Sequence, residues 1–335
     1  METKKYRFDE VTINFDKKRI PLSSAQREKR QGTFRYYGAQ GVIDHVDDYI
    51  YDGTYLLIAE DGENLKSKKQ NIAQVVDGQF WVNNHAHIVQ GNEQCDTRFL
   101  CYLINSMDLS GYVTGSAQPK LSQANLNAIT LSLPTLVEQK RIVEYLYMLD
   151  QKIDVNRQIN DNLADLLQTV YQERFGDTSL IANQGILSDI CSYSRDKVAV
   201  SELNVSTYFS TENMLSGKAG STEATSLPTT SQTTACHKGD TLISNIRPYF
   251  KKIVYCEDNC GCSTDVLCFT PSQPRYSAYL FSTLYADKFF AFMVAGSKGT
   301  KMPRGDKQQI MTYPVVLPSE EELAGFNTIA SPLLE

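Results

Sequence analysis

Residues 135–175 contain neither glycine nor proline, and residues that favour helices dominate them. Thr135, followed three residues later by Glu138, fits a capping box at the start of this segment. At 1.5 Å per residue, a helix over 135–175 would be roughly 60 Å long, several times the usual length of a globular helix. The chain is therefore constrained to fold around a helix that is too long for an ordinary core.

The apolar residues of this segment recur with heptad spacing, and Asn156 and Asn160 occupy two positions of the same seam. Polar seam residues reduce stability but can set register and partner. A plain coiled-coil spacer and a ruler that holds two domains apart both agree with this pattern. We expect the seam to pack against a second helix or another subunit; its residues are Ile142, Leu146, Leu149, Ile153, Leu163, Leu167 and Val170.

Similar blocks occur in the same order on both sides of the predicted helix, which indicates two diverged copies of one domain. Three upstream blocks match: Tyr51–Ile58 with His237–Ser244, Asn84–Val89 with Thr264–Phe269, and Arg98–Leu103 with Ala278–Phe281. Downstream, we align Gly115-Ser116 and Lys120-Leu121 with Gly296-Ser297 and Lys301-Met302, and Ile129–Pro134 with Tyr313–Pro318.

Strand signals in each copy are short and β-branched or aromatic, and helical signals are few. We expect strands at Tyr55–Ala59, Gln79–Val82, Ala86–Val89, Thr241–Ile243 and Val266–Thr270, and helices at Thr97–Asp108 and Arg275–Ala295. The predicted fold is α+β, with two tandem, mostly-β domains separated by a long coiled-coil-type helix. The expected boundaries are 1–134, 135–175, 176–318 and 319–335, the last being the start of a further helix.

Composition is that of an ordinary globular protein, with 41% hydrophobic and 21% charged residues. The net charge of −6 argues against a nonspecific polybasic nucleic-acid binder, although residues 1–42 carry ten basic and five acidic side chains. No apolar run approaches the roughly 18 residues of a membrane helix, and the charged start is unlike a signal peptide. A cytoplasmic protein with no membrane partner is expected.

Eight cysteines are present, and we expect free thiols. Cys256, Cys260 and Cys262 cluster, and Cys236 could complete a set of four ligands. Their spacing lacks the paired C-x2-C pattern of zinc sites, so a metal site is the less favoured interpretation. The sequence also contains no phosphate-binding loop, no Ser/His/Asp set and no cofactor fingerprint, so no catalytic residue is predicted.

The block from Gly115 through Pro134, and on into the helix through Asn160, resembles the central region of the specificity subunits of type I restriction-modification systems. It reads GSAQPKLS, then LP, then EQKRIV and LDQKI. Taken with the duplicated domains, the resemblance covers the whole chain. Members of this family usually carry a second long helix at the C-terminus. Here that helix would begin near Glu320 and stop at Glu335, so a shortened form is expected.

The resemblance implies a non-catalytic DNA-specificity subunit. Each recognition domain would read one half of a split, asymmetric site on double-stranded DNA, and the helix would set the separation of the halves. It also implies methyltransferase (modification) subunits as partners, with a restriction subunit as a further candidate, and S-adenosylmethionine, ATP and Mg would belong to these partner subunits. Self-association through the unpaired helix is a further expectation. No cofactor is expected on this chain.

Base reading requires amides, arginines and hydroxyls on loops, with lysines and arginines on phosphates. For any single residue, a solvated loop position is an equally good interpretation. The first-copy candidates are Arg35, Tyr36, Tyr37, Gln40, Lys66, Lys68, Lys69, Asn83, Asn84, His85, Gln118, Lys120 and Ser122. The second-copy candidates are Asn245, Arg247, Tyr249, Lys251, Lys252, Lys298, Lys301 and Arg304, and Phe250 lies among them.

Two other classes of function remain open. A non-catalytic scaffold whose two domains bind other proteins would also explain the duplication and the long helix. A metal-dependent enzyme would use the cysteine cluster. A bipartite DNA footprint favours the specificity subunit over the scaffold, and metal analysis tests the enzyme.

Overall fold

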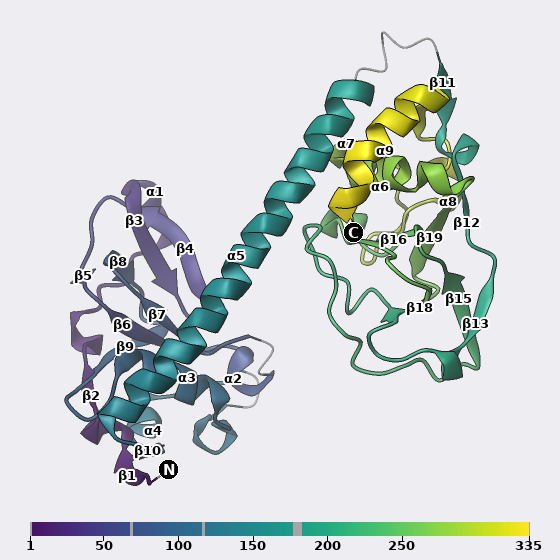
Figure 1. Cartoon of the computed structure of the whole chain (residues 1–335). Helices are drawn as coiled ribbons and strands as arrows, with labels where there is room; N and C mark the ends of the chain where they lie inside the picture. Colours follow the sequence, from purple (N-terminus) through teal and green to yellow (C-terminus); the bar gives the residue numbers. More distant parts are fainter. Residues whose placement is uncertain (1, 68–69, 116–117, 177–182, 335) are drawn as a thin grey trace. The chain divides into compact units, whose positions relative to one another are not determined.

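The computed structural model describes residues 2–67, 70–115, 118–176 and 183–334. The chain divides into two compact units, Met1–Asp154 and Val155–Glu335, and the division falls within the long helix α5 (Leu136–Phe175). Figure 1 shows α5 running from one mostly-β unit into the other. The predicted α+β fold and its continuous central helix are therefore confirmed.

Unit 1 contains a four-stranded antiparallel sheet with the order β2-β9-β6-β7. The helix α3 packs against it and buries Leu100 and Ile104 together with Leu56 and Ile58 of the central strand. The N-cap of α3 is Asp96, whose side chain accepts from the backbone of Arg98 and Phe99. These elements span Thr12–Asn14 (β2), Tyr55–Ala59 (β6), Ala73–Val76 (β7), Ala86–Gly91 (β9) and Thr97–Ser106 (α3).

A second sheet of unit 1 has the order β4-β3-β8-β5, with β3 parallel to β8. Its strands are Gln31–Gly38 (β3), Gly41–Val46 (β4), Tyr51–Asp52 (β5) and Gln79–Val82 (β8). In addition, β1 (Lys4–Arg7) pairs with β10 (Thr130–Leu133), directly before α5. The short helices are η1 (Phe8–Glu10), η2 (Asp16–Lys18), α1 (Ser24–Glu28), α2 (Asn64–Ser67), η3 (Ser110–Tyr112) and α4 (Gln123–Asn127).

Unit 2 repeats the first sheet of unit 1 as β12-β19-β16-β17, again antiparallel throughout. The helix α6 takes the place of α3 against it. The bounds are Cys191–Tyr193 (β12), Thr241–Ser244 (β16), Ile253–Tyr255 (β17), Val266–Pro271 (β19) and Ser277–Tyr285 (α6). The helix predicted over Arg275–Ala295 is divided into η7 (Pro274–Tyr276), α6 and α7 (Asp287–Ala295), because the backbone of Ala286 is extended.

The second sheets of the two units differ in their edges. In unit 2 the order is β13-β15-β18-β14, and β14 is the parallel neighbour of β18. The bounds are Lys197–Ala199 (β13), Tyr208–Phe209 (β14), Gln232–Cys236 (β15) and Cys260–Cys262 (β18). The remaining elements are β11 (Gln184–Ile186), η4 (Leu187–Asp189), η5 (Val200–Glu202), η6 (Pro248–Phe250), α8 (Lys307–Ile310), β20 (Pro314–Val316) and α9 (Glu320–Leu334).

The start of α5 is fixed to unit 1 by a buried amide. Thr135 Oγ1 accepts from the backbone N–H of Glu138, as the capping pattern predicts. The fully buried Gln139 side chain accepts from Asp96 N and donates to the carbonyl oxygens of Gln94 and Pro134. Because a buried amide without partners is costly, these three bonds define where the helix begins.

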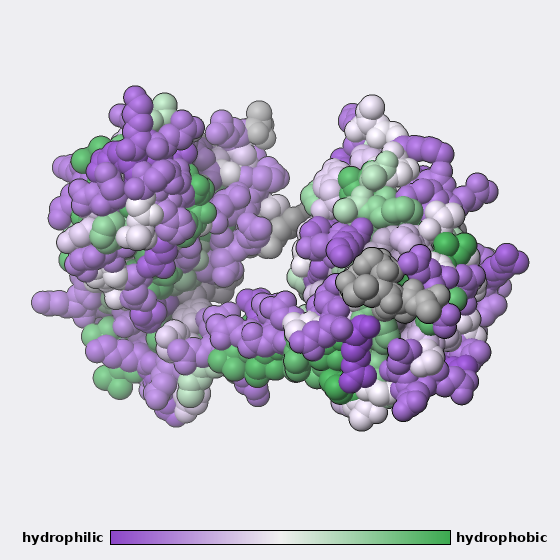
Figure 2. All heavy atoms as spheres, turned by 90° about the horizontal axis from the view of Figure 1, so that it is seen from above, coloured by the Kyte–Doolittle hydropathy of each residue, from purple (hydrophilic) through white to green (hydrophobic). Residues whose placement is uncertain are grey.

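The predicted seam of α5 is divided among three environments. Ile142 packs against the core of unit 1, and Leu167 and Val170 pack into the core of unit 2 with α9. Between them, Leu149 is 57% exposed and Ile153 is 48% exposed. The half-buried Leu146 and Leu163 flank this stretch. Figure 2 shows apolar residues on the surface of the connecting helix. The exposed large side chains of α5 also include Tyr145, Met148, Val155, Ile159 and Leu166.

Among the residues that the structure describes, no helix combines the length and apolar character that crossing a membrane requires.

Candidate nucleic-acid interface

In unit 1, the chain leaving β6 meets a tight loop at Lys120. The backbones of Thr114 and Lys120 exchange two hydrogen bonds, of 2.9 and 2.8 Å. Gly115 has a φ of +83°, and a Cβ there would lie 2.3 Å from the carbonyl oxygen of Gln118, so only glycine fits. Asp61 pairs with Lys120 across this loop. We call residues 60–62 together with 114–115 and 118–121 the Lys120 corner.

Unit 2 builds the same arrangement after β16. Lys298 and Arg304 exchange two backbone hydrogen bonds of 2.9 Å, and Ile246 pairs with Arg304. Gly299 has a φ of +101° and occupies the position of Gly115. The backbone N–H of Arg247 donates to Pro303, the counterpart of Pro119, at 2.8 Å. We call residues 245–247 together with 298–305 the Arg304 corner.

This geometry corrects the alignment predicted from sequence. The match of Gly296-Ser297 with Gly115-Ser116, and of Lys301 with Lys120, is wrong by three positions. The structure pairs Gly299 with Gly115 and Arg304 with Lys120, which is the same offset that relates Pro318 to Pro134. Ser116 lies outside the described residues, so its structure is not part of this comparison.

Lys120 and Arg304 occupy equivalent positions of the two corners, and each lies partly exposed beside at least one carboxylate. Lys120 Nζ lies 3.2 Å from Glu60 and 3.9 Å from Asp61, and its side chain is 51% exposed. Arg304 lies 2.9 Å from Asp265, and its side chain is 56% exposed. Ion pairs at this exposure contribute little to stability, because water screens them. Both cations are therefore held in position yet remain accessible to an anion.

A buried histidine contacts the Lys120 corner through the carbonyl oxygen of Leu121. His87 Nδ1 lies 2.6 Å from Asp16 Oδ2, and its Nε2 lies 2.8 Å from the carbonyl oxygen of Leu121. Since an ionised carboxylate and a carbonyl both only accept, both ring nitrogens donate and His87 is the imidazolium. Arg19 joins the group by pairing with Asp16 and Glu60.

The pKa shifts of this pair agree with that protonation state. Burial by itself would lower the pKa of His87, but the hydrogen bonds to Asp16 and Leu121 and the charges of Asp16 and Glu60 leave it raised. Burial would raise the pKa of Asp16, but its bonds from His87 and the Ile88 N–H leave it lowered. The sequence pattern did not single out either contact, because 71 residues separate the two partners.

Several predicted contacts of the first copy gather at the Lys120 corner. Lys66 Nζ donates to the carbonyl oxygen of Gly115 at 2.7 Å, and His85 lies 2.8 Å from Asp61. Gln118 is exposed in the corner itself, and Asn84 is exposed in the turn between β8 and β9, next to His85. Gln40 reaches Asn64 at 2.9 Å, next to Gly62. Arg35 lies elsewhere, donating to Asp77, while Lys68 and Lys69 fall outside the described residues.

Four first-copy residues that were predicted to contact DNA have structural roles instead. Tyr36 is fully buried and Tyr37 is 4% exposed, so both are core residues and cannot reach DNA. Asn83 is buried and its Oδ1 accepts from the His85 backbone, which makes it a turn residue. Ser122 is the N-cap of α4, where its hydroxyl accepts from Asn125 N.

The second-copy candidates also separate into two groups. Arg247, Tyr249, Lys301 and Arg304 carry side chains at the surface around the Arg304 corner, and Lys298 is there too but bonds Asp306 at 2.5 Å. Asn245 was predicted to contact DNA, but its side chain is buried, so it is a structural residue. Lys252 donates to the carbonyl oxygen of Thr211, and Lys251 pairs with Asp287 at 2.9 Å. Asp265, Gly299 and Pro303 are site residues that sequence reasoning missed.

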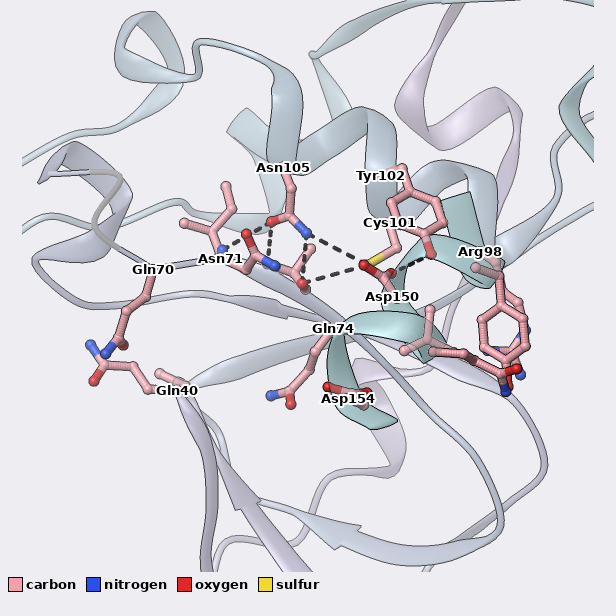
Figure 3. A pocket seen from close by; sticks show the side chains of 16 residues that line it. Gln40, Gln70, Asn71, Gln74, Arg98, Cys101, Tyr102, Asn105, Asp150 and Asp154 are labelled. Carbon is pink, nitrogen blue, oxygen red and sulfur yellow. Dashed lines mark hydrogen bonds between the residues drawn. The ribbon is translucent and has the colours of Figure 1, made fainter. Parts of the chain in front are cut away.

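A polar hollow of about 720 Å³ lies in unit 1 between β7, α3 and residues 147–154 of α5 (Figure 3). Tyr102 donates to Asp150 of α5 at 2.6 Å, which ties that helix to α3. Asn105 accepts from the backbones of Ile72 and Ala73 and donates to Ala73, so it covers the free edge of β7. The lining is rich in amides, including Gln40, Gln70 and Gln74.

The four cysteines considered as metal ligands lie together in one buried apolar cluster of unit 2. The Sγ atoms of Cys256 and Cys260 are 3.6 Å apart, and all eight cysteines are free thiols. Within residues 2–67, 70–115, 118–176 and 183–334, no three His, Cys, Asp or Glu side chains are arranged to hold a metal ion. These thiols therefore contribute to packing in this structure.

Two pseudo-equivalent corners thus lie on a duplicated α+β domain, and one long helix connects the two copies. Residues 2–164 match the family described as the type I restriction modification DNA specificity domain. This match covers just under half of the chain, and it confirms the resemblance to type I restriction-modification specificity subunits.

Related proteins agree with this match. A Haemophilus influenzae protein assigned as a type I restriction enzyme specificity subunit, S.HindORF215P, is 36% identical over 138 residues, which is 41% of this chain and 35% of that protein. The Escherichia coli type I restriction enzyme EcoprrI specificity subunit is 26% identical over 125 residues, 37% of this chain and 30% of that protein. The matches thus span about a third of these relatives' lengths.

The whole chain also shares its fold with a solved structure. The type I restriction-modification S subunit from M. genitalium superimposes with a TM-score of 0.63, covering 99% of this chain and 89% of that one. At 14% identity, this similarity establishes the architecture alone.

Proposed function

We propose that this chain is the DNA sequence-specificity subunit of a type I restriction-modification complex. Each unit, taken as one recognition domain, reads one half of a bipartite site on double-stranded DNA, and α5 sets the separation of the halves. The observation that carries the proposal is the repetition of the corner. Both units keep a left-handed glycine, a proline and an accessible cation, although their second sheets have diverged.

An accessible cation on a tightly held loop suits a DNA contact. Lysine contacts phosphate as a point charge, whereas arginine can also make bidentate bonds to guanine. Both cations are restrained by carboxylates, so little side-chain entropy is lost on binding. The chain itself is proposed to be non-catalytic. Methyl transfer from S-adenosylmethionine, and ATP- and Mg-dependent cleavage, would belong to modification and restriction subunits.

Co-expression with the cognate modification subunit, followed by sequencing of methylated bases in host DNA, tests this function. A split motif with a fixed spacer, absent when this gene is deleted, is the expected result. A purified complex should protect the same two half-sites in a footprint. A stable complex that methylates no motif and leaves no bipartite footprint would instead favour the protein-interaction scaffold.

The exposed middle of α5 is proposed as the surface that docks the modification subunits. Its apolar side chains, led by Leu149 and Ile153, are those that a soluble helix would be expected to cover. We expect the double substitution Leu149→Asp and Ile153→Asp to abolish co-elution with the modification subunit on gel filtration. Gln158→Asp, on the opposite side of the same helix, is the matched control. Co-elution of the double variant at wild-type yield would contradict the docking proposal.

A further inference from the structure

We propose that Tyr249 and Phe250 form an aromatic wedge that enters between stacked base pairs in the half-site read by unit 2. This inference rests on the proposed function and deepens it, because it assigns unit 2 a way of reading DNA by deformation. The wedge is the tip of the loop between β16 and β17, next to the Arg304 corner.

The backbone of this loop is strained in a way that fixes its tip. Arg247 and Lys251 both adopt the left-handed conformation, each with a φ of +50°, on either side of η6. Non-glycine residues rarely adopt this conformation, because their Cβ atom crowds the backbone there. Such strained residues persist only where the surrounding structure holds them, and they cluster at functional sites. Two of them in one short loop therefore indicate that the tip has a functional role.

Neighbouring segments hold both ends of the loop in place. On one side, the N–H of Arg247 donates to Pro303 of the Arg304 corner at 2.8 Å. On the other, the N–H groups of Gly217 and Lys218 donate to the carbonyl oxygens of Phe250 and Lys251 at 2.8 and 2.9 Å. Asp287 at the start of α7 pairs with both Lys218 and Lys251. The tip is therefore rigid before any ligand arrives, which reduces the entropy cost of binding.

Within this anchored loop the two aromatic rings point outward. Tyr249 is 50% exposed and Phe250 is 38% exposed, whereas Pro248 between them and Arg247 is buried. The ring centroids lie 4.7 Å apart with an interplanar angle of 57°, so the two rings contact each other. Two adjacent aromatic rings on a loop tip are unfavourable in water unless a partner covers them.

The positively charged side chains near the two rings favour DNA as the partner, because its phosphates are negatively charged. Arg247 directly precedes the tip, and its backbone bond to Pro303 joins the tip to the loop that carries the exposed Lys301 and Arg304. Apolar side chains flanked by cations are the arrangement by which minor-groove proteins unstack a base step while holding the adjacent phosphates. Flexible pyrimidine–purine steps unstack at least cost, so the wedge would favour such a step at one position of the half-site.

The test uses the complete methyltransferase complex and a duplex that carries the split motif found by methylome sequencing. 2-Aminopurine is placed in turn at each position of the unit 2 half-site. Its fluorescence should rise at one step on binding, because unstacking relieves quenching. The double substitution Tyr249→Ala and Phe250→Ala should abolish this rise and weaken binding by about 10- to 100-fold, as loss of base–aromatic stacking does elsewhere.

The exchange variant Tyr249→Phe with Phe250→Tyr keeps both rings and is the matched control. It should retain the fluorescence rise and the wild-type affinity. A double alanine variant that binds and unstacks like the wild type would overturn the wedge while leaving the proposed function intact. A wild-type complex that recognises no split motif would overturn the proposed function, and the wedge with it. A rise in the unit 1 half-site alone would also refute the wedge.

Discussion

Replacement of His87 by leucine is expected to destabilise unit 1 by about 3 kcal/mol, the lower end of the range for breaking a buried ion pair. The variant leaves the Asp16 carboxylate buried with only Arg19, at 3.5 Å, and the Ile88 N–H as partners. It also leaves the Leu121 carbonyl oxygen without its bond from the ring. Trp81 is the single tryptophan and lies buried in unit 1, so its fluorescence during urea unfolding reports this change. His45→Leu, at an exposed position of β4, is the control.

The same pair makes the stability of unit 1 depend on pH. The pKa of His87 is raised in the folded state, so its contribution is complete below the unfolded value of about 6.5 and is lost as pH rises through the folded value. The pKa of Asp16 is lowered, so its contribution is present above about 3.8 and is lost as pH falls through the folded value. The difference in the free energy of unfolding between the wild type and His87→Leu should therefore become smaller as the pH is raised above 6.5. If the difference in the free energy of unfolding is constant from pH 6 to pH 9, His87 is not an imidazolium in the folded protein.

Lys120→Ala and Arg304→Ala are each expected to weaken DNA binding by the complex about 10-fold, and together about 100-fold. One lost charged contact costs roughly 1–3 kcal/mol, and sites in separate units add. If each cation meets a phosphate, each variant should also reduce the slope of log affinity against log salt by about one. Fluorescence anisotropy at three salt concentrations measures both quantities.

Controls for this experiment come from basic residues of the same units. Lys5 lies on β1, and Lys238 lies at the end of β16 away from the corner; both are exposed. Alanine at either position should leave affinity and salt slope unchanged. Equal losses from Lys238→Ala and Arg304→Ala would mean that general charge, and not the corner, attracts the DNA.

Sequence comparison of the two copies could not predict which residues of the two corners are structurally equivalent. Gly296-Ser297 looks more like Gly115-Ser116 than Gly299-Thr300 does, yet the backbone pairs Lys298 with Arg304 as it pairs Thr114 with Lys120. A left-handed φ and a hydrogen-bonded register decide equivalence here, and residue identity reports neither directly. Pro119 and Pro303 were the available signal, because they recur at the offset that the Leu-Pro pairs already defined.

Burial was the other property that the sequence left open. Tyr36 and Tyr37 lie beside Arg35 in a glycine-bounded segment that resembles a contact loop, but β3 turns both rings into cores. His87 and Asp16 come together only because β9 lies beside β2 in the sheet. The seam of α5 was readable, but which of its residues would be covered depended on where each unit packs against the helix.

The long helix, the duplicated α+β domain and the resemblance to specificity subunits could all be predicted from the amino-acid sequence. These features follow from local propensity, periodicity and repeated motifs, all of which are written along the chain. The folded structure was needed to show which cations form the two corners, which buried histidine contacts one of them, and which exposed aromatic pair lies next to the other. Those outcomes depend on contacts between residues far apart in the chain, and such contacts exist only once the sheets have formed.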